Sequence, residues 1–392
     1  MINNLVTEIG ALSINHVNEE LCGDHYEVVT CDNDNTYIAV LADGLGSGVK
    51  ANILSTITSK LISTMMANNI SLEECVETIV ETLPICKIRG IAYSTFTILK
   101  ITNNNEAEIY NYDNPEPIML RNGKEYKVVT TEMVIAGKKI YHIKTNCLPY
   151  DTFILLSDGT IHAGIGQSMN FGWERPQIID YIAGLYNKEY SSKALATELI
   201  EHCDLLYNRE PGDDTTCLVA RIRKRQMVNL LIGPASFLNA DKEMLSLFFS
   251  KEGKHIVCGG TTSNIVAKYL NTSLIVDDEY IDKTIPPMSH IKGVDLVTEG
   301  VITINRVLEY AKNDLGRNEC YFDWCYKQDG ASQIARLLFE EATDINFYVG
   351  CAMNPAHQKD NLSINFKTKM QLIEELSKIL KTMGKKIKVS YF

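Results

Sequence analysis

LADGLGSG, residues 41–48, places a carboxylate and three glycines at the end of an apolar run. The preceding residues 37–42 are expected to form a buried strand, and an amphipathic helix is expected to begin near Val49. Aspartate is rarely buried unless it is paired or bound to a cation, and glycine lets backbone carbonyls approach a ligand closely. The stretch therefore suits Mg²⁺ or Mn²⁺, although a strand-to-helix turn capped by Asp43 is the simpler alternative.

Carboxylates at predicted strand ends recur elsewhere in the first half of the chain. A second apolar run, residues 153–157, ends at Asp158, and Asp213 and Asp214 directly precede a further apolar strand. Asp24 lies at the start of another predicted strand. Two metal ions in a hydrolytic site share carboxylate ligands and lower the pKa of a bound water. The recurrence therefore favours a two-metal site over a set of unrelated turns.

The order and context of these motifs resemble the PPM family of metal-dependent protein Ser/Thr phosphatases, in the branch typified by the bacterial stage II sporulation protein E. The match covers about residues 1–222. It is carried by CGD at residues 22–24, ADGLGSG at 42–48, LSDG at 156–159 and DDTT at 213–216. The resemblance implies a PPM-type α-β-β-α sandwich for the N-terminal domain.

The resemblance also implies a role for each candidate metal ligand. Asp43 would bridge two Mn²⁺ or Mg²⁺ ions, and the carbonyl of Gly44 would add a further ligand. Asp158 and Asp213 would hold one ion, while Asp24 would face the other. These residues are the catalytic candidates of the chain.

Several positions depart from the eukaryotic members of the family. Asp214 stands where those members usually have Asn, and we expect it to support the site as a hydrogen-bond acceptor, with the choice between it and the preceding acid left open. Leu45 replaces a His proposed as general acid, and no Arg occurs before Arg89 to hold the phosphate. The leaving oxygen would then be protonated by metal-bound water. His25 or His162 could assist, but an outward-facing histidine is the simpler interpretation of both.

Composition limits the classes of partner and compartment. A chain of 392 residues predicts two domains. A net charge of −11 argues against nucleic-acid binding, which needs concentrated Lys and Arg. The sequence has no signal-peptide pattern and no run of eighteen apolar residues, so we expect no membrane association. The eleven cysteines are scattered and odd in number, which favours the reducing cytoplasm.

The pattern of predicted elements changes near residue 225. In residues 1–224 we expect helices at 51–69, from Ser71, at 176–186 and at 191–208, and strands at 26–31, 36–42, 92–101, 106–112, 117–120, 125–128, 140–144, 152–157 and 216–222. In residues 225–392 we expect strands at 228–232, 255–258, 272–276, 345–349 and 386–392, alternating with helices at 240–250, 263–270, 301–313, 330–342 and 367–383. Such alternation predicts a C-terminal α/β domain of mainly parallel strands.

The C-terminal domain contains one candidate binding turn. Residues 258–264, CGGTTSN, end a predicted strand and open a helix, and amides and hydroxyls at such a junction suit an anion. The candidate residues are Gly259, Gly260, Thr261 and Thr262, and a tight turn with a capped helix is the alternative. A second acidic junction at 295–300 could face the same crevice. The sequence names no ligand.

The sequence therefore predicts a Mn²⁺- or Mg²⁺-dependent phosphatase that uses a metal-activated water. The resemblance implies phosphoserine or phosphothreonine substrates on a bacterial signalling protein, for example an anti-sigma-factor antagonist. The C-terminal domain is expected to be regulatory, binding a small-molecule or anionic effector. A non-catalytic phosphatase-like sensor that binds partners is the alternative from another class. A homodimer is left open.

Overall fold

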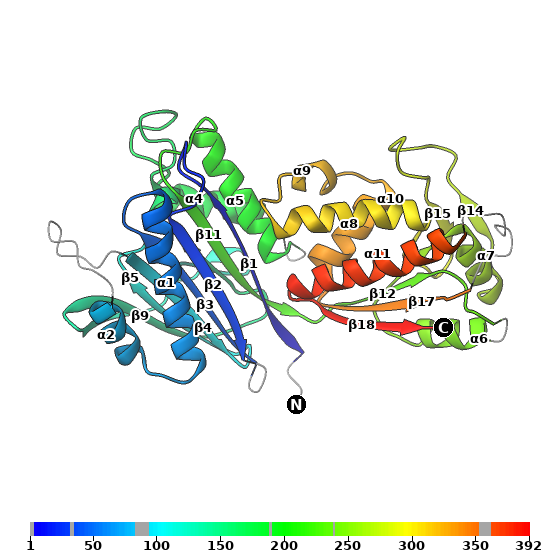
Figure 1. Ribbon diagram of the computed structural model, residues 1–392, viewed down its shortest axis with the longest axis horizontal. Helices are drawn as coiled ribbons and strands as arrows, with labels where there is room; N and C mark the ends of the chain where they lie inside the picture. Colours follow the sequence, from blue (N-terminus) through cyan, green and yellow to red (C-terminus); the bar gives the residue numbers. More distant parts are fainter. Residues whose placement is uncertain (1–3, 32–34, 83–93, 188–189, 238–239, 353–361) are drawn as a thin grey trace. The chain divides into compact units, whose positions relative to one another are not determined.

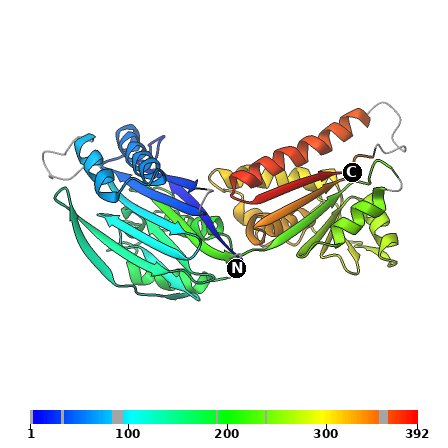
Figure 2. The same cartoon turned by 90° about the horizontal axis from the view of Figure 1, so that it is seen from below.

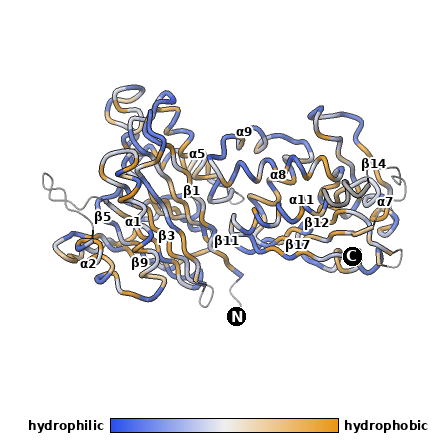
Figure 3. The backbone as a smooth tube through the Cα atoms, in the orientation of Figure 1, coloured by the Kyte–Doolittle hydropathy of each residue, from blue (hydrophilic) through white to orange (hydrophobic). Residues whose placement is uncertain are grey.

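A computed structural model describes residues 4–31, 35–82, 94–187, 190–237, 240–352 and 362–392. The chain divides into two compact units, Met1–Lys224 and Arg225–Phe392. Each unit is considered separately below (Figure 1). Hydrophobic residues follow the strands within each unit, as Figure 3 shows. Among the described residues, no helix has the length and apolar character needed to cross a membrane.

The first unit contains two antiparallel sheets. One has the strand order β1 (Leu5–Ile14), β11 (Thr215–Lys224), β10 (Thr152–Leu156), β6 (Ile118–Arg121) and β7 (Lys124–Glu125). The other has the order β2 (Asp24–Cys31), β3 (Thr36–Gly44), β4 (Ser94–Thr102), β5 (Glu106–Tyr112), β9 (Lys138–Asn146) and β8 (Thr130–Ile135). The sheets pack through one buried apolar cluster that includes Leu41 and Leu99 from one sheet and Phe153 and Leu218 from the other.

Helices cover the outer face of each sheet. Helices α1 (Gly48–Ala67) and α2 (Leu72–Thr82) pack on the six-stranded sheet, and Figure 2 shows them in blue on one side of the unit. Helices α4 (Arg175–Leu185) and α5 (Ser192–Leu206) cover the five-stranded sheet, and a short helix α3 (Asp158–Ile161) follows β10. The layers run helix, sheet, sheet, helix, which confirms the predicted α-β-β-α sandwich.

The second unit is a seven-stranded sheet with helices on both faces (Figures 1 and 2). The strand order is β14 (Leu274–Val276), β15 (Ser289–Ile291), β16 (Leu296–Thr298), β13 (Lys254–Cys258), β12 (Met227–Ile232), β17 (Asp344–Val349) and β18 (Lys386–Tyr391). The helical segments are α6 (Ala240–Phe249), α7 (Gly260–Tyr269), α8 (Val301–Leu315), α9 (Tyr321–Trp324), α10 (Gly330–Ala335), the π-helix η1 (Arg336–Glu341) and α11 (Leu362–Thr382).

Most of the pairings in this second sheet are parallel. The strands from β16 through β18 pair in parallel, and only the pairings of β15 are antiparallel. The predicted C-terminal domain of mainly parallel strands is therefore confirmed. The chain adds β13 and β16 on one side of β12 and then β17 and β18 on the other, so the winding direction reverses beside β12.

Some elements differ from the sequence prediction. Strand β1 was not predicted because its polar and small residues do not alternate regularly, yet it pairs with β11 along its whole length. Strand β8 was also missed, since several of its side chains are exposed on an edge. The start of the strand expected at 92–101 lies outside the described residues, and the strand expected at 125–128 is only β7. The dipeptide Asn122-Gly123, typical of tight hairpin turns, joins β6 to β7.

Candidate metal centre

Strand pairing brings Asp24 and Asp43 together at one end of the six-stranded sheet. The two residues are direct partners in the antiparallel register of β2 and β3. Side chains alternate between the faces of a strand, and Leu41, two residues before Asp43, packs between the sheets. Both carboxylates therefore face the space between the two sheets.

The other sheet supplies acids from the same side. Asp158 lies two residues after the end of β10, and Asp213 and Asp214 directly precede β11, its antiparallel neighbour. The amide of Ser157 donates to the carbonyl of Thr216 at 3.0 Å, and the amide of Thr216 donates to Ser157 Oγ at 2.8 Å. These bonds fix the two strand ends beside each other, so acids far apart in the sequence meet at one edge.

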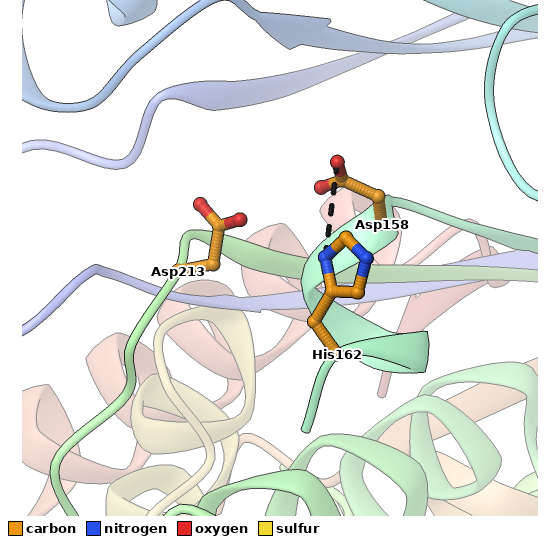
Figure 4. Close-up of side chains that lie close together, drawn as sticks. All are labelled: Asp158, His162 and Asp213. Atoms are coloured by element: carbon orange, nitrogen blue, oxygen red, sulfur yellow. Dashed lines mark ion pairs between the residues drawn. The ribbon is translucent and has the colours of Figure 1, made fainter. Parts of the chain in front are cut away.

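Asp158, His162 and Asp213 form the most compact group of candidate ligands. One ligand atom from each lies within 4.8 Å of the others. Figure 4 shows the His162 ring, one turn after Asp158, facing that carboxylate, with Asp213 approaching from the loop before β11. His162 Nδ1 lies 4.0 Å from Asp158 Oδ2, and both side chains are about half exposed. The group is therefore open to solvent and to a substrate.

Asp24 and Asp214 form the buried side of the cluster. Each residue is only 3% exposed. Both carboxylate oxygens of Asp24 and Oδ2 of Asp214 have no hydrogen-bond partner among the described residues. The other oxygen of Asp214 accepts a hydrogen bond from the backbone N–H of His16 at 3.0 Å. Buried charged oxygens without partners are costly, so these atoms favour a bound cation.

Mutual repulsion and burial perturb the acids strongly. Burial, followed by the charges of Asp24 and Asp158, raises the pKa of Asp43 to about 10. Burial, followed by the charge of Asp158, raises the pKa of Asp213 to about 6. Burial also raises the pKa of Asp24 well above its usual range; the nearby Ser157 and Thr216 hydroxyls oppose this rise, and the charges of Asp214 and Asp158 add to it. The cluster must gain either protons or cations at neutral pH.

Glycines allow this close convergence. A Cβ atom on Gly44 would lie 2.1 Å from the carbonyl oxygen of Ala51 in α1. A Cβ atom on Gly159 would lie 2.2 Å from the carbonyl oxygen of Asp214, and one on Gly23 would lie 2.5 Å from Asp214 Oδ2. Each of these glycines follows or precedes a candidate acid. They are needed because larger residues would separate the chain segments that carry the carboxylates.

A buried polar network beside Asp43 was not recognised from the sequence. Thr95 is the register partner of Asp43 on β4, and its hydroxyl donates to Asn114 Oδ1. Asn114 Nδ2 donates to Thr97 Oγ1 at 3.0 Å and to the carbonyl oxygen of Leu41 at 3.4 Å. Threonines at alternate positions of an otherwise apolar strand were the available signal. The network ties β4 to the end of β3 that carries the acid.

The two histidines considered from the sequence lie in different surroundings. His25 Nδ1 is 2.7 Å from Ser59 Oγ of α1, on the opposite face of β2 from Asp24. His25 is thus directed away from the acids. His162 instead belongs to the compact ligand group, a difference between the two histidines that was not predicted from the sequence.

The candidate turn of the second unit, residues 259–262, is held by contacts with other residues of the same unit. Thr262 Oγ1 accepts a hydrogen bond from the backbone N–H of Gly233 at 3.0 Å, and a Cβ atom on Gly260 would lie 3.3 Å from Glu299 Oε1. Gly259, at φ +110°, is the N-cap residue directly before α7, whose first residues include Thr261. The nearby carboxylate of Glu299 disfavours a bare anion at this turn.

Comparison with known proteins identifies the first unit. Residues 33–223 match the family model described as Stage II sporulation protein E (SpoIIE). No curated protein matches the chain. The phosphatase domain of SpoIIE from Bacillus subtilis is 19% identical, with a TM-score of 0.44 and coverage of 56% of this chain and 94% of that one. The RsbU and RsbW domains of a Mycobacterium tuberculosis protein are 12% identical, with a TM-score of 0.49 and coverage of 83% and 79%.

The CGD motif, residues 22–24, lies before the first residue of the family match. The match includes the other three acidic motifs. It runs from before β3 into β11 and therefore includes strands of both sheets, although β1 and β2 lie before it. The resemblance inferred from the motifs is confirmed. The first unit of this chain is a SpoIIE-like phosphatase domain of the PPM type.

Proposed function

We propose that the first unit hydrolyses phosphoserine or phosphothreonine esters on a signalling protein, using two divalent cations. One observation supports this most strongly. Carboxylates from four separate segments of the chain converge at one edge between the sheets, and among the described residues no basic side chain pairs with the buried oxygens of Asp24. A structural salt-bridge cluster would supply basic side chains for these oxygens.

The donor set fits Mn²⁺ or Mg²⁺. Carboxylate oxygens suit these hard cations. The pKa of Asp43 is raised first by burial and then by the neighbouring acids, and a bound cation would offset both effects. Asp43 would be shared between the two ions, with the Gly44 carbonyl as a further donor. Asp158 and Asp213 would hold one ion, and Asp24 would face the other. When bound, the ions would supply an acidified water and neutralise charge on the phosphoryl oxygens.

The protein itself presets the orientation of the carboxylates. The N–H of Asp214 donates to Asp213 Oδ1 at 2.9 Å, and the N–H of His16 donates to Asp214 Oδ1 at 3.0 Å. His162, on the exposed side of Asp158, lies where a substrate would enter. Preset groups lose little freedom when the reaction proceeds. We propose that Asp214 helps to orient the carboxylate cluster and that His162 lies at the solvent-exposed side of the cluster.

An anti-sigma-factor antagonist phosphorylated on serine is the proposed physiological substrate. The proposal rests on the SpoIIE-type family of the first unit. The first test is hydrolysis of p-nitrophenyl phosphate by the full chain with and without Mn²⁺, with Asp180→Asn, an exposed acid on α4, as a control variant. Hydrolysis that depends on Mn²⁺ supports the enzyme. Absence of hydrolysis at saturating Mn²⁺ would favour the non-catalytic sensor.

We further propose that the second unit regulates the first by binding a small molecule. The loops after β12, β13 and β16 lie at the carboxyl edge of a parallel sheet, where ligands of such sheets bind. The Gly259–Thr262 turn lies at this edge, and Glu299 favours a ligand with hydroxyl or amino donors over a bare anion. A change in phosphatase rate on addition of a nucleoside or polyol would support this role, and Gly260→Val should abolish the change.

A further inference from the structure

A hollow lies directly beside the compact ligand group of the first unit. Its volume is about 440 Å³. His162 lines the hollow and also belongs to the group with Asp158 and Asp213. The hollow therefore borders the compact ligand group at His162. The hollow has no role in the proposed binding of the metal ions.

The inner wall of this hollow is apolar. Ile118, Leu156 and Ile178 line it, and each is at most 2% exposed. Ile161 adds a further apolar side chain from α3. Phe171 stands on the rim and is 82% exposed. An exposed aromatic side chain next to a concave apolar surface is typical of a recognition site.

The charged groups at the rim select against acidic ligands. Arg175 Nε pairs with Glu116 at 3.2 Å, and its Nη2 pairs with Glu125 at 3.1 Å and with the carbonyl oxygen of Pro117 at 3.3 Å. The glutamates that line the hollow, Glu116 and Glu174, outnumber its one arginine, and Arg175 is already paired with carboxylates. An acidic side chain entering the hollow would meet a net negative field.

We infer that this hollow binds an apolar side chain of the phosphoprotein substrate, adjacent in sequence to the phosphorylated residue. The inference rests on the proposed function and deepens it, because it names a specificity-determining subsite. A leucine or similar side chain fits the apolar wall, with Phe171 closing over it. Aspartate or glutamate at the same substrate position is excluded by the glutamates of the rim.

The test compares two sets of peptides on the full chain. Phosphoserine peptides carry Leu or Asp at each position on either side of the phosphoserine, and kcat/KM is measured with Mn²⁺. Matching phosphonate peptides, which cannot be hydrolysed, report binding by fluorescence anisotropy. The variants are Phe171→Ala and the control Val129→Ala, an equally exposed apolar residue in the same unit that does not line the hollow.

We expect one position at which Leu is preferred over Asp by about tenfold or more, the size of effect that an apolar subsite supplies. Phe171→Ala should reduce this preference severalfold in both kcat/KM and binding, whereas Val129→Ala should keep the wild-type preference in both measurements. The same preference in Phe171→Ala as in the wild type would overturn the subsite, as would a wild type without preference. Peptide binding with this pattern but no hydrolysis would keep the subsite and reject the phosphatase activity.

Discussion

At the scale of single residues, Asp43 is the acid that the surrounding charges affect most clearly. It lies opposite Asp24 in the strand register, and its pKa is raised to about 10 by burial and by the neighbouring acids. A carboxylate in this position is unfavourable without a partner of opposite charge. A substitution of Asp43 should therefore affect metal binding without disrupting the fold.

Asp43→Asn should reduce Mn²⁺-dependent hydrolysis of p-nitrophenyl phosphate by more than about tenfold, because the charge shared by two cations is lost. The fold should persist, since Asn has the same shape and removes repulsion. Circular dichroism checks the fold, and Asp180→Asn is the control. A variant that keeps more than a tenth of the wild-type rate would contradict the bridging role.

Asp158→Asn and Asp213→Asn should each raise the Mn²⁺ concentration needed for half-maximal rate. Each variant loses one charged ligand, and even partners outside direct metal contact change affinity by about 10- to 100-fold. A titration of the initial rate with Mn²⁺ measures this. If either variant titrates like the wild type, that residue does not bind the metal.

Stability of the metal-free protein should increase as the pH falls from about 8 to about 6. The folded pKa of Asp43, about 10, exceeds the ordinary value of 3.8, so the native state binds more protons than the unfolded state throughout this range. The destabilising contribution of Asp43 is fully present above its folded pKa. This contribution decreases as the pH falls toward the ordinary pKa of 3.8. Thermal unfolding with a chelator should show a higher Tm at the lower pH.

Asp43→Asn provides the control for this pH effect, because the variant has no titrating group at that position. Its Tm in chelator should exceed that of the wild type at about pH 8 and should change less between the two pH values. A wild-type Tm that rises with pH over this window would show that other groups dominate the linkage.

At the scale of elements, the turn between β3 and α1 joins the metal site to the covering helix. Gly44 leaves room for the Ala51 carbonyl of α1, and a Cβ atom there would lie only 2.1 Å from it. The helix and the end of the strand must therefore shift together. Movement of α1 would therefore displace Asp43, and α1 is a candidate element for transmitting a signal to the site.

Gly44→Ala should destabilise the first unit by about 1–3 kcal/mol, the usual cost of forcing an atom into a packed contact, and should also weaken Mn²⁺ activation. Gly184→Ala is a suitable control, because no atom lies within 4 Å of the added Cβ on this helical glycine of α4. The control should be neutral or slightly stabilising. Denaturant unfolding measures both, and equal stability for the two variants would contradict the packing argument.

At the scale of the whole molecule, the two compact units divide the chain after Lys224. All the candidate metal ligands belong to the first unit, and its sheets form a core of their own. We expect a fragment of residues 1–224 to fold and to retain Mn²⁺-dependent hydrolysis at an altered rate. Circular dichroism and the p-nitrophenyl phosphate assay test this. A folded fragment without activity would show that the second unit contributes to the reaction.

The sequence alone determined the class of fold, and it predicted which acids would form the proposed site. Periodicity predicted most helices and strands because their apolar faces are regular, and four acidic motifs at strand ends indicated one shared centre. Strand β1 was missed, since its residues carry no regular alternation and only pairing with β11 orders it.

Only the tertiary structure decided which side chains meet. Register placed Asp24 opposite Asp43, and the short helix α3 turned His162 toward Asp158, whereas His25 faces α1. The hollow lined by Phe171 brings together residues 115–118, Leu156 and residues 161–178, which no local pattern connects. Local sequence fixes which face of an element is apolar, but the contacts between distant segments depend on how the sheets and helices pack, because that packing is a property of the whole domain.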